Sequence, residues 1–110
     1  PDDVRRKITP RTRAIVPVHW FGQPADMDAL MEIAAEHDLY VIEDSCHGPH
    51  IRLNGRETGS FGEITCWSMQ QTKMFTAAGE GGLATTNDVD LADRHSCGPL
   101  GSPPWATTIG

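Results

Sequence analysis

Residues 14–44, AIVPVHWFGQPADMDALMEIAAEHDLYVIED, predict the fold of this chain. The segment 14–18 is a short apolar run, as expected of a strand that is buried on both faces. A second such run, residues 39–43, leads to an acid at Asp44. A helix between two such strands makes a strand–helix–strand unit, which implies a right-handed crossover and parallel strands. Because Pro17 cannot donate a ladder hydrogen bond, we expect it at a sheet edge or a strand end.

The segment between the two runs carries the signals of an amphipathic helix over residues 26–37. Asp26 offers an N-cap carboxylate, and Asp28 adds negative charge in the first turn, where the helix dipole favours it. Apolar side chains recur at the spacing i, i+3, i+4 and i+7 and therefore share one face of the helix. This face consists of Met27, Leu30, Met31 and Ala34.

Further elements on both sides of this unit alternate as in part of a larger α/β sheet. Asn54-Gly55 is a strong turn dipeptide inside an irregular stretch. Asn87-Asp88 is expected to begin a short helix that ends near His95, and His37 is expected at the end of a helix and His19 in a loop. The remaining expected elements are a helix end at 2–7 and strands at 64–68 and 82–86.

The amino-acid composition argues against some classes of binding partner. The 110 residues carry a formal net charge of -6, with a pI of about 5.2, which argues against a nucleic-acid or anionic-membrane surface. Basic residues cluster at 5–7 and 11–13, but no aromatic residues are interleaved with them, so we interpret them as solvated. No apolar run approaches the roughly 20 residues needed to span a bilayer, and no signal peptide is visible.

The cysteines favour a reducing compartment. Cys46, Cys66 and Cys97 cannot all pair internally and show no two-by-two metal spacing, which suits the cytosol. Cys66 alternates with apolar neighbours and is expected to be a small core residue. Cys46, His47 and His50 suggest a metal site as a minor alternative, although no fourth ligand stands at a usual spacing.

Lys73 is the main candidate for chemistry. It lies in the stretch SMQQTKMFTAAGEGG, residues 68–82, between a predicted strand and a glycine cluster. Ligands of open parallel sheets bind at the carboxyl ends of strands. Asp44 and Ser68 stand at the carboxyl ends of two predicted strands, and His19 follows a third. A strand-end carboxylate and a loop lysine are what a pyridoxal phosphate site needs. The lysine forms a Schiff base with the cofactor, and the carboxylate keeps the pyridine nitrogen protonated.

Five ordered segments carry a resemblance to a known family. They are TPRTRAIVPVH at 9–19, GQPADM at 22–27, VIED at 41–44, GSFG at 59–62, and TK with GEGG at 72–82. Together they resemble the DegT/DnrJ/EryC1/StrS aminotransferases, over about Ile8 to Arg94. The resemblance implies a fold-type I pyridoxal phosphate enzyme that aminates keto-sugars. It also implies that the chain is part of the mainly parallel, helix-flanked sheet of the large domain of such an enzyme.

The same resemblance implies the roles of four residues. Lys73 matches the Schiff-base lysine, and Asp44 matches the aspartate that pairs with the pyridinium nitrogen. Ser68 matches a serine that binds the cofactor phosphate. His47 stands where the family commonly has a glutamine near the phenolic oxygen of the cofactor, and a histidine can make the same hydrogen bond.

The identity of Lys73 also favours one reaction within the family. Sugar 3-dehydratases of this kind carry histidine in place of the lysine, so Lys73 favours transamination with an amino acid as donor. A lysine that the substrate has displaced can move a proton between the substrate and the cofactor. Met69, Gln70 and Gln71 resemble the branch that aminates cyclitol ketones in aminoglycoside biosynthesis, where glutamine is the usual donor.

The resemblance covers only part of a family member. We assign residues 1–96 to a partial cofactor-binding large domain and residues 97–110 to a loop or a divergent or truncated tail. The N-terminal phosphate turn and the C-terminal small domain of the family are not matched. The resemblance implies a homodimer whose active sites lie between subunits, and the cysteine usage favours a cytoplasmic location. The alternative is a catalytically inert cofactor-binding or structural fragment of such an enzyme.

Overall fold

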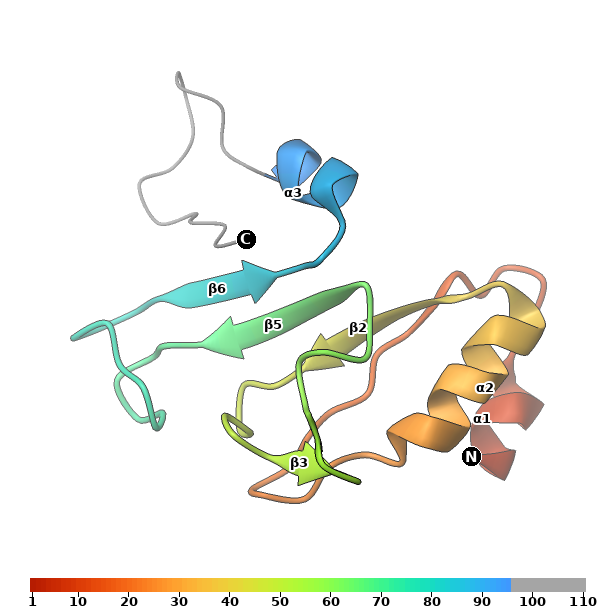
Figure 1. The fold of residues 1–110 in the computed structure, drawn as a ribbon, viewed down its shortest axis with the longest axis horizontal. Coiled ribbons are helices and arrows are strands. Elements are labelled where there is room, and N and C mark those ends of the chain that lie inside the picture. Colours follow the sequence, from red (N-terminus) through yellow and green to blue (C-terminus); the bar gives the residue numbers. More distant parts are fainter. Residues whose placement is uncertain (96–110) are drawn as a thin grey trace.

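The computed structural model describes residues 1–95, so the predicted tail at 97–110 lies outside the described residues. A four-stranded sheet runs in the order β1-β2-β5-β6, and a separate hairpin pairs β3 with β4. Figure 1 shows helices α1 and α2 together on one side of this sheet and α3 beyond β6. The helices are α1 (Asp2–Lys7), α2 (Met27–His37) and α3 (Val89–His95). The strands are β1 (Ala14–Ile15), β2 (Tyr40–Asp44), β3 (Arg52–Leu53), β4 (Arg56–Glu57), β5 (Ile64–Ser68) and β6 (Gly82–Thr85).

The strand–helix–strand unit is present, and its two strands are parallel, with Ala14 opposite Tyr40. Strand β1 is shorter than the predicted 14–18, because Pro17 has no N–H for the ladder. Pairing resumes only as an isolated bridge between Val18 and Asp44. Strand β1 lies at the sheet edge, which confirms the position expected from the proline.

The sheet is mainly parallel, and its last strand reverses direction. Strand β5 runs parallel to β2, with Asp44 opposite Cys66. Strand β6 runs antiparallel to β5, with Ser68 opposite Gly82. Residues 69–81 therefore form a hairpin connection, and the carboxyl ends of β2 and β5 lie at the edge where this connection is made (Figure 1). Strand β1 runs parallel to β2, so its carboxyl end lies at the same edge.

Helix α2 supplies most of the apolar core. Asp26 caps it, since its Oδ1 accepts a hydrogen bond of 3.3 Å from the Ala29 N–H. The helix ends at Asp38, which adopts a left-handed conformation with φ of 53°. The buried core cluster consists of Met27, Leu30, Ile33, Ala34, Val41 and Phe61. The predicted apolar face was thus slightly rotated, because Ile33 is buried and Met31 is only partly buried.

The two faces of the sheet differ in burial. Val41, Glu43 and Thr65 are fully buried, and Val41 belongs to the core cluster with α2. Since side chains alternate along a strand, Asp44 and Cys66 lie on the opposite face, where both are only half-buried. The expectation that Cys66 is a core residue was therefore wrong, because its neighbour Thr65 takes the inward position.

Two smaller elements match turn and cap signals in the sequence. The Asn54-Gly55 turn is confirmed, with φ of 50° and 82°, although the short strands β3 and β4 on either side of it were not predicted. Asp88 caps α3, since its Oδ1 accepts hydrogen bonds from the N–H groups of Asp90 and Leu91. Within residues 1–95, no helix has the length and apolarity required to cross a bilayer.

Candidate active site

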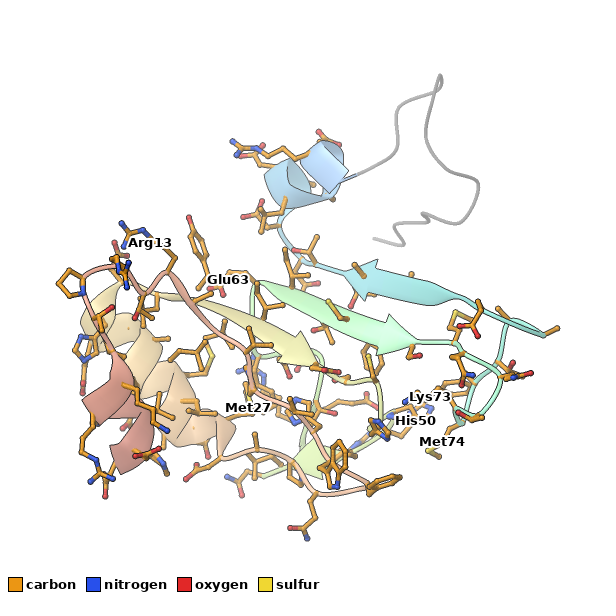
Figure 2. The ribbon with its side chains drawn as sticks, turned by 180° about the vertical axis from the view of Figure 1, so that it is seen from behind. Arg13, Met27, His50, Glu63, Lys73 and Met74 are labelled. Atoms are coloured by element: carbon orange, nitrogen blue, oxygen red, sulfur yellow. The ribbon has the colours of Figure 1, made fainter. Side chains whose placement is uncertain are left out.

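Four predicted site residues gather at the carboxyl ends of the central strands. Asp44 is the last residue of β2 and Ser68 is the last residue of β5. His47 follows β2 in the turn after Asp44, and Lys73 lies in the hairpin connection. Figure 2 shows Lys73, Met74 and His50 at this end of the sheet and Arg13 and Glu63 at the opposite end.

Lys73 is held by its own loop and by a direct partner. Its Nζ lies 2.9 Å from Nε2 of His47. Its backbone N–H donates to the Gln70 carbonyl at 2.8 Å. The base of the loop is closed by two further hydrogen bonds, from the Met69 N–H to the Gly81 carbonyl and from the Ala77 N–H to the Met69 carbonyl. The loop therefore fixes where the lysine leaves the backbone.

Asp44 is held as a carboxylate. Its Oδ1 accepts a hydrogen bond of 3.0 Å from the backbone N–H of Cys46. Burial by itself would raise the pKa of Asp44, but hydrogen bonds from the Cys46 thiol and N–H outweigh it, and the charges of His47 and Lys73 add to this, so the pKa is lowered. Burial and the adjacent carboxylate raise the pKa of the Cys46 thiol to about 11. The group beside the acid is therefore a neutral thiol.

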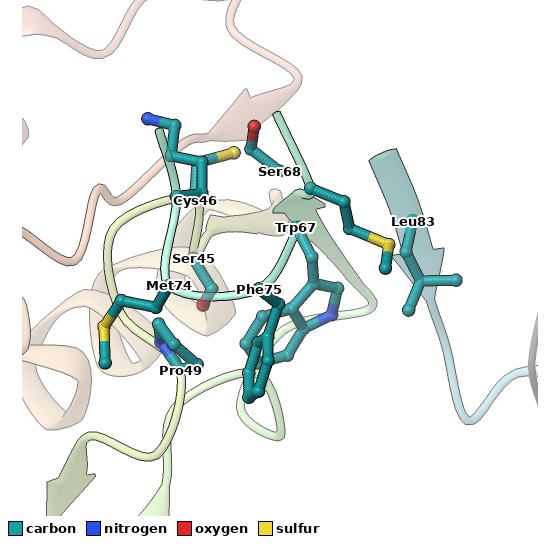
Figure 3. Close-up of a pocket in the computed structure, with 10 residues that line it drawn as sticks. Ser45, Cys46, Pro49, Trp67, Ser68, Met74, Phe75 and Leu83 are labelled. Atoms are coloured by element: carbon teal, nitrogen blue, oxygen red, sulfur yellow. The ribbon is translucent and has the colours of Figure 1, made fainter. Parts of the chain in front are cut away.

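A pocket of about 180 Å³ opens beside these residues. Figure 3 shows Trp67, Phe75 and Leu83 as apolar parts of its lining, with the side chains of Cys46 and Ser68 near one another. Ser45 also lines the pocket, is only 1% exposed, and has an Oγ without a hydrogen-bond partner among residues 1–95. Since a buried hydroxyl without a partner is costly, this atom marks an unsatisfied hydrogen-bonding position next to the pocket.

A buried hydrogen-bond network next to the site was not predicted. Glu43 is fully buried, and its Oε1 accepts hydrogen bonds of 2.7 Å from the N–H groups of Phe61 and Gly62. Its Oε2 accepts from the Gly59 N–H at 2.7 Å and contacts His19 Nε2 at 3.0 Å. All four partners are donors, so Glu43 is an ionised carboxylate with every acceptor direction used.

His19 is also fully buried, although the sequence indicates only a loop position for it. The Ala25 N–H donates to its Nδ1 at 3.2 Å, so the ring proton lies on Nε2 and is donated to Glu43. The backbone N–H of His19 donates to the Asp44 carbonyl at 3.0 Å. Burial alone would raise the pKa of Glu43, but the bonds from His19 and the three backbone N–H groups lower it. An acid one residue before Asp44, at an inward strand position, is the signal that could have revealed this network.

Two exposed aromatic residues flank His47. Trp20 and Gln23 exchange two backbone hydrogen bonds of 2.9 Å and close a tight turn. Phe21 takes a left-handed φ of 43° in this turn, which is unusual for a bulky residue. The rings of Trp20 and Phe21 each lie 4.8 Å from the His47 ring, centroid to centroid. The strained turn thus presents two aromatic rings to His47.

The alternative metal site gains no support from the arrangement of these groups. Across residues 1–95, the histidine, cysteine, aspartate and glutamate side chains form no group of three or more that could hold a metal ion. His50 instead contacts Glu57, with Nδ1 3.0 Å from Oε1.

Comparison with known proteins shows the family of the chain. The family model of the DegT/DnrJ/EryC1/StrS aminotransferase family matches residues 1–98. The chain belongs to this family. Among DegT-family relatives, a UDP-N-acetyl-3-dehydro-alpha-D-glucosamine 3-aminotransferase of Acidithiobacillus ferrooxidans is 43% identical over 94% of the chain and 28% of the relative. A putative L-glutamine:3-amino-2,3-dideoxy-scyllo-inosose aminotransferase of Streptoalloteichus tenebrarius is 48% identical over 80% of the chain and 21% of the relative.

Solved structures of DegT-family proteins share the fold. An aminotransferase from Psychrobacter cryohalolentis has a TM-score of 0.80 at 45% identity, over 83% of this chain and 23% of that one. NtdA from Bacillus subtilis, solved with the cofactor PMP bound, has a TM-score of 0.65 at 38% identity, over 76% of this chain and 18% of that one. The chain thus spans about a quarter of the length of the relatives it matches. The predicted fold, part of the mainly parallel sheet of a fold-type I large domain, is confirmed.

Proposed function

We propose that this chain is the lysine-bearing part of a pyridoxal phosphate-dependent aminotransferase. The enzyme moves an amino group from glutamine or glutamate to a keto-sugar or a keto-cyclitol. The observation that carries the proposal is the convergence of Lys73, Asp44 and Ser68 on one edge of the sheet, beside the pocket. Lysine, carboxylate and hydroxyl are the donor set that this cofactor requires.

The residues of the site fit the cofactor chemically. Lys73 supplies the amine that holds the cofactor covalently, and Asp44 supplies the permanent negative charge that a protonated pyridine nitrogen needs. Ser68 is the hydroxyl for the phosphate. Ser45 lines the same pocket, and its Oγ is buried and has no hydrogen-bond partner among residues 1–95. Bound pyridoxal phosphate supplies an electron sink for the transfer of the amino group.

The chain's own groups set up the proton transfers. Lys73 takes and returns a proton at Nζ when the substrate amine has replaced it on the cofactor. His47 holds Lys73 through its Nε2. The neutral Cys46 thiol keeps the position beside Asp44 free of a second negative charge. The presence of lysine at position 73 favours transamination over the dehydration that histidine-bearing members perform.

The substrate class rests on the names of relatives. A relative that is 43% identical is named for a UDP-linked keto-sugar, and a relative that is 48% identical is named for glutamine and an inosose. The second name agrees with the aminocyclitol resemblance of Met69, Gln70 and Gln71. We also propose that the full-length enzyme is a homodimer, as the family resemblance implies, and that it is cytoplasmic, as the cysteine usage favours.

Covalent trapping tests this function. The full-length protein is incubated with pyridoxal phosphate, reduced with borohydride, digested and mapped by mass spectrometry. We expect the phosphopyridoxyl adduct on Lys73, and we expect the Lys73→Arg variant to lose it. An adduct found only on Lys7, an exposed lysine paired with Asp3, would overturn the proposal.

A second assay separates transamination from dehydration. The full-length enzyme receives amide-labelled or amine-labelled glutamine, or labelled glutamate, together with a keto-sugar or keto-cyclitol. We expect labelled nitrogen in the product sugar or cyclitol. Release of water from the substrate without incorporation of nitrogen would contradict the aminotransferase assignment.

A further inference from the structure

The contact between Lys73 and His47 joins two basic groups. Their nitrogens, Nζ and Nε2, lie 2.9 Å apart. Only one hydrogen fits between them, so one nitrogen must accept. An ammonium has no acceptor site, and an imidazolium has none either. While the pair carries one positive charge, the bond has two forms: a Lys73 ammonium that donates to a neutral His47, or a His47 imidazolium that donates to a neutral Lys73. The two forms differ only in the position of one proton.

The surroundings of His47 suit both forms. Trp20 and Phe21 pack against the imidazole at tilted interplanar angles of 37° and 63° and restrict its rotation. Aromatic faces also attract a cationic ring, so these contacts tolerate the imidazolium. Because the histidine is half-buried, it retains access to solvent.

Two titratable groups act on the pair from the end of β2. The Asp44 carboxylate lies close enough to His47 and Lys73 for positive charge on either to lower its pKa, and it favours a positive charge on the pair in return. The Cys46 thiol is neutral below about pH 11 and adds no charge. The aromatic turn on the other side contributes no ionisable group. The pair therefore holds one proton beside a fixed negative charge.

We propose that His47 is the proton-exchange partner of Lys73. Its Nε2 takes a proton from the Lys73 ammonium and the ring then returns a proton to solvent. The Nζ–H bond breaks as the Nε2–H bond forms, and no electrons are gained or lost. The inference rests on the proposed function, because a released lysine must be neutral before it can take a proton from the substrate. Glutamine, the residue that the family resemblance leads us to expect here, can accept the hydrogen bond but cannot take up the proton.

Amine labelling of the cofactor-free, full-length protein tests this role. Lys73 is labelled with trinitrobenzenesulfonate and quantified by peptide mapping, in the wild type and in His47→Gln. At about pH 5 we expect wild-type Lys73 to react about tenfold faster than in His47→Gln, because His47 can carry the shared proton and leave Lys73 neutral. At about pH 9 we expect the two rates to agree within about twofold.

His50→Gln is the matched control, since His50 is exposed and contacts Glu57. We expect it to follow the wild type at both pH values. A wild-type-to-variant ratio that does not change with pH, or an equal effect of His50→Gln, overturns the inference. Should His47→Gln fail to fold, His47→Asn takes its place, with the same expected ratios and the same contradicting results. Because this labelling uses the cofactor-free protein, its result is independent of the adduct mapping, which tests the proposed function.

Discussion

Two adjacent acids at the end of β2, Glu43 and Asp44, have different surroundings and different roles. Glu43 points to the α2 side of the sheet, is fully buried, and is surrounded by four hydrogen-bond donors. Asp44 points to the other face, is half-buried, and accepts one backbone hydrogen bond in addition to the Cys46 thiol contact. The alternation of a strand thus separates an acid that holds loops in place from one that remains available to a ligand.

Substitution of Asp44 tests the second role. We expect Asp44→Asn in the full-length enzyme to retain the cofactor but to lose nearly all turnover, because an amide is no counter-ion for a protonated pyridine. Cofactor retention is measured by absorbance and turnover by product formation. The control is Asp90→Asn, at an exposed residue of α3. Turnover at the parental rate in Asp44→Asn would show that Asp44 does not hold this role.

Substitution of Glu43 tests the first role. Glu43→Gln places an amide NH₂ against N–H donors, so at least one buried donor loses its partner, at a cost of about 1–3 kcal/mol in the free energy of unfolding. The control is Glu57→Gln, whose carboxylate contacts the exposed His50. Urea unfolding of the full-length variants measures the difference. Equal losses for both variants would contradict the special position of Glu43.

The same substitution has a pH signature. The pKa of Glu43 is lowered in the folded protein. Its stabilising contribution is therefore fully present above the ordinary carboxyl range, near pH 4.5, and is lost as the pH falls through the lowered folded value. We expect the stability difference between wild type and Glu43→Gln to be constant near neutral pH and to shrink in acid.

At the scale of elements, β2 organises the segment that follows the β3–β4 hairpin. The Glu43 carboxylate collects the N–H groups of Gly59, Phe61 and Gly62. Gly62 also lies so close to β2 that an added Cβ would stand 2.4 Å from the Val41 carbonyl oxygen. The 59–62 segment therefore docks on β2 both by hydrogen bonding and by close backbone approach.

Gly62→Ala tests this docking. A Cβ against a backbone oxygen cannot be relieved by a change of rotamer, so we expect a loss of about 1–3 kcal/mol, as for overpacked cores. Gly79→Ala is the control, because a Cβ there meets nothing within 4 Å, and its effect should remain within about 0.5 kcal/mol. Thermal unfolding of both variants measures the difference, and a neutral Gly62→Ala would refute the close approach.

The sequence predicts the elements whose signals are local. The cap at Asp26, the turn at Asn54-Gly55 and the proline limit on β1 each follow from the chemistry of one or two residues. The burial of His19 could not be predicted, because it depends on segments far apart in the chain meeting at β2. For Glu43 the sequence holds one local signal, its inward position one residue before Asp44. The prediction that Cys66 is a core residue was wrong for the same reason, since alternation alone does not say which face of β5 turns inward.

At the scale of the whole molecule, apolar side chains remain exposed on the described residues. Tyr40 is 61% exposed, Val16 is 58% exposed and Met74 is 76% exposed. The core cluster with α2 covers one face of the sheet, and the face that bears Asp44 is only half-buried. Parallel strands ordinarily require cover on both faces.

We therefore expect the 110-residue chain on its own to be marginally stable. It should bind a hydrophobic dye, tend to aggregate, bind pyridoxal phosphate weakly and show no measurable aminotransfer. Dye fluorescence, light scattering and the labelled-nitrogen assay measure these properties, with the full-length protein as the control. Robust turnover by the isolated chain would overturn this expectation.

The reversed strand β6 has a further consequence for the loop that carries Lys73. Both ends of residues 69–81 are anchored on neighbouring strands and joined by the hydrogen bond from Met69 to Gly81. Part of such a loop can be exchanged without changing the strands that hold it. The part of the loop after Lys73 can be exchanged for that of a homologue while the strand register stays fixed, since changing the length of a loop costs little chain entropy. Chimaeras that swap only 74–80 and retain Lys73 would thus vary Met74 and Phe75 in the pocket lining on an unchanged scaffold.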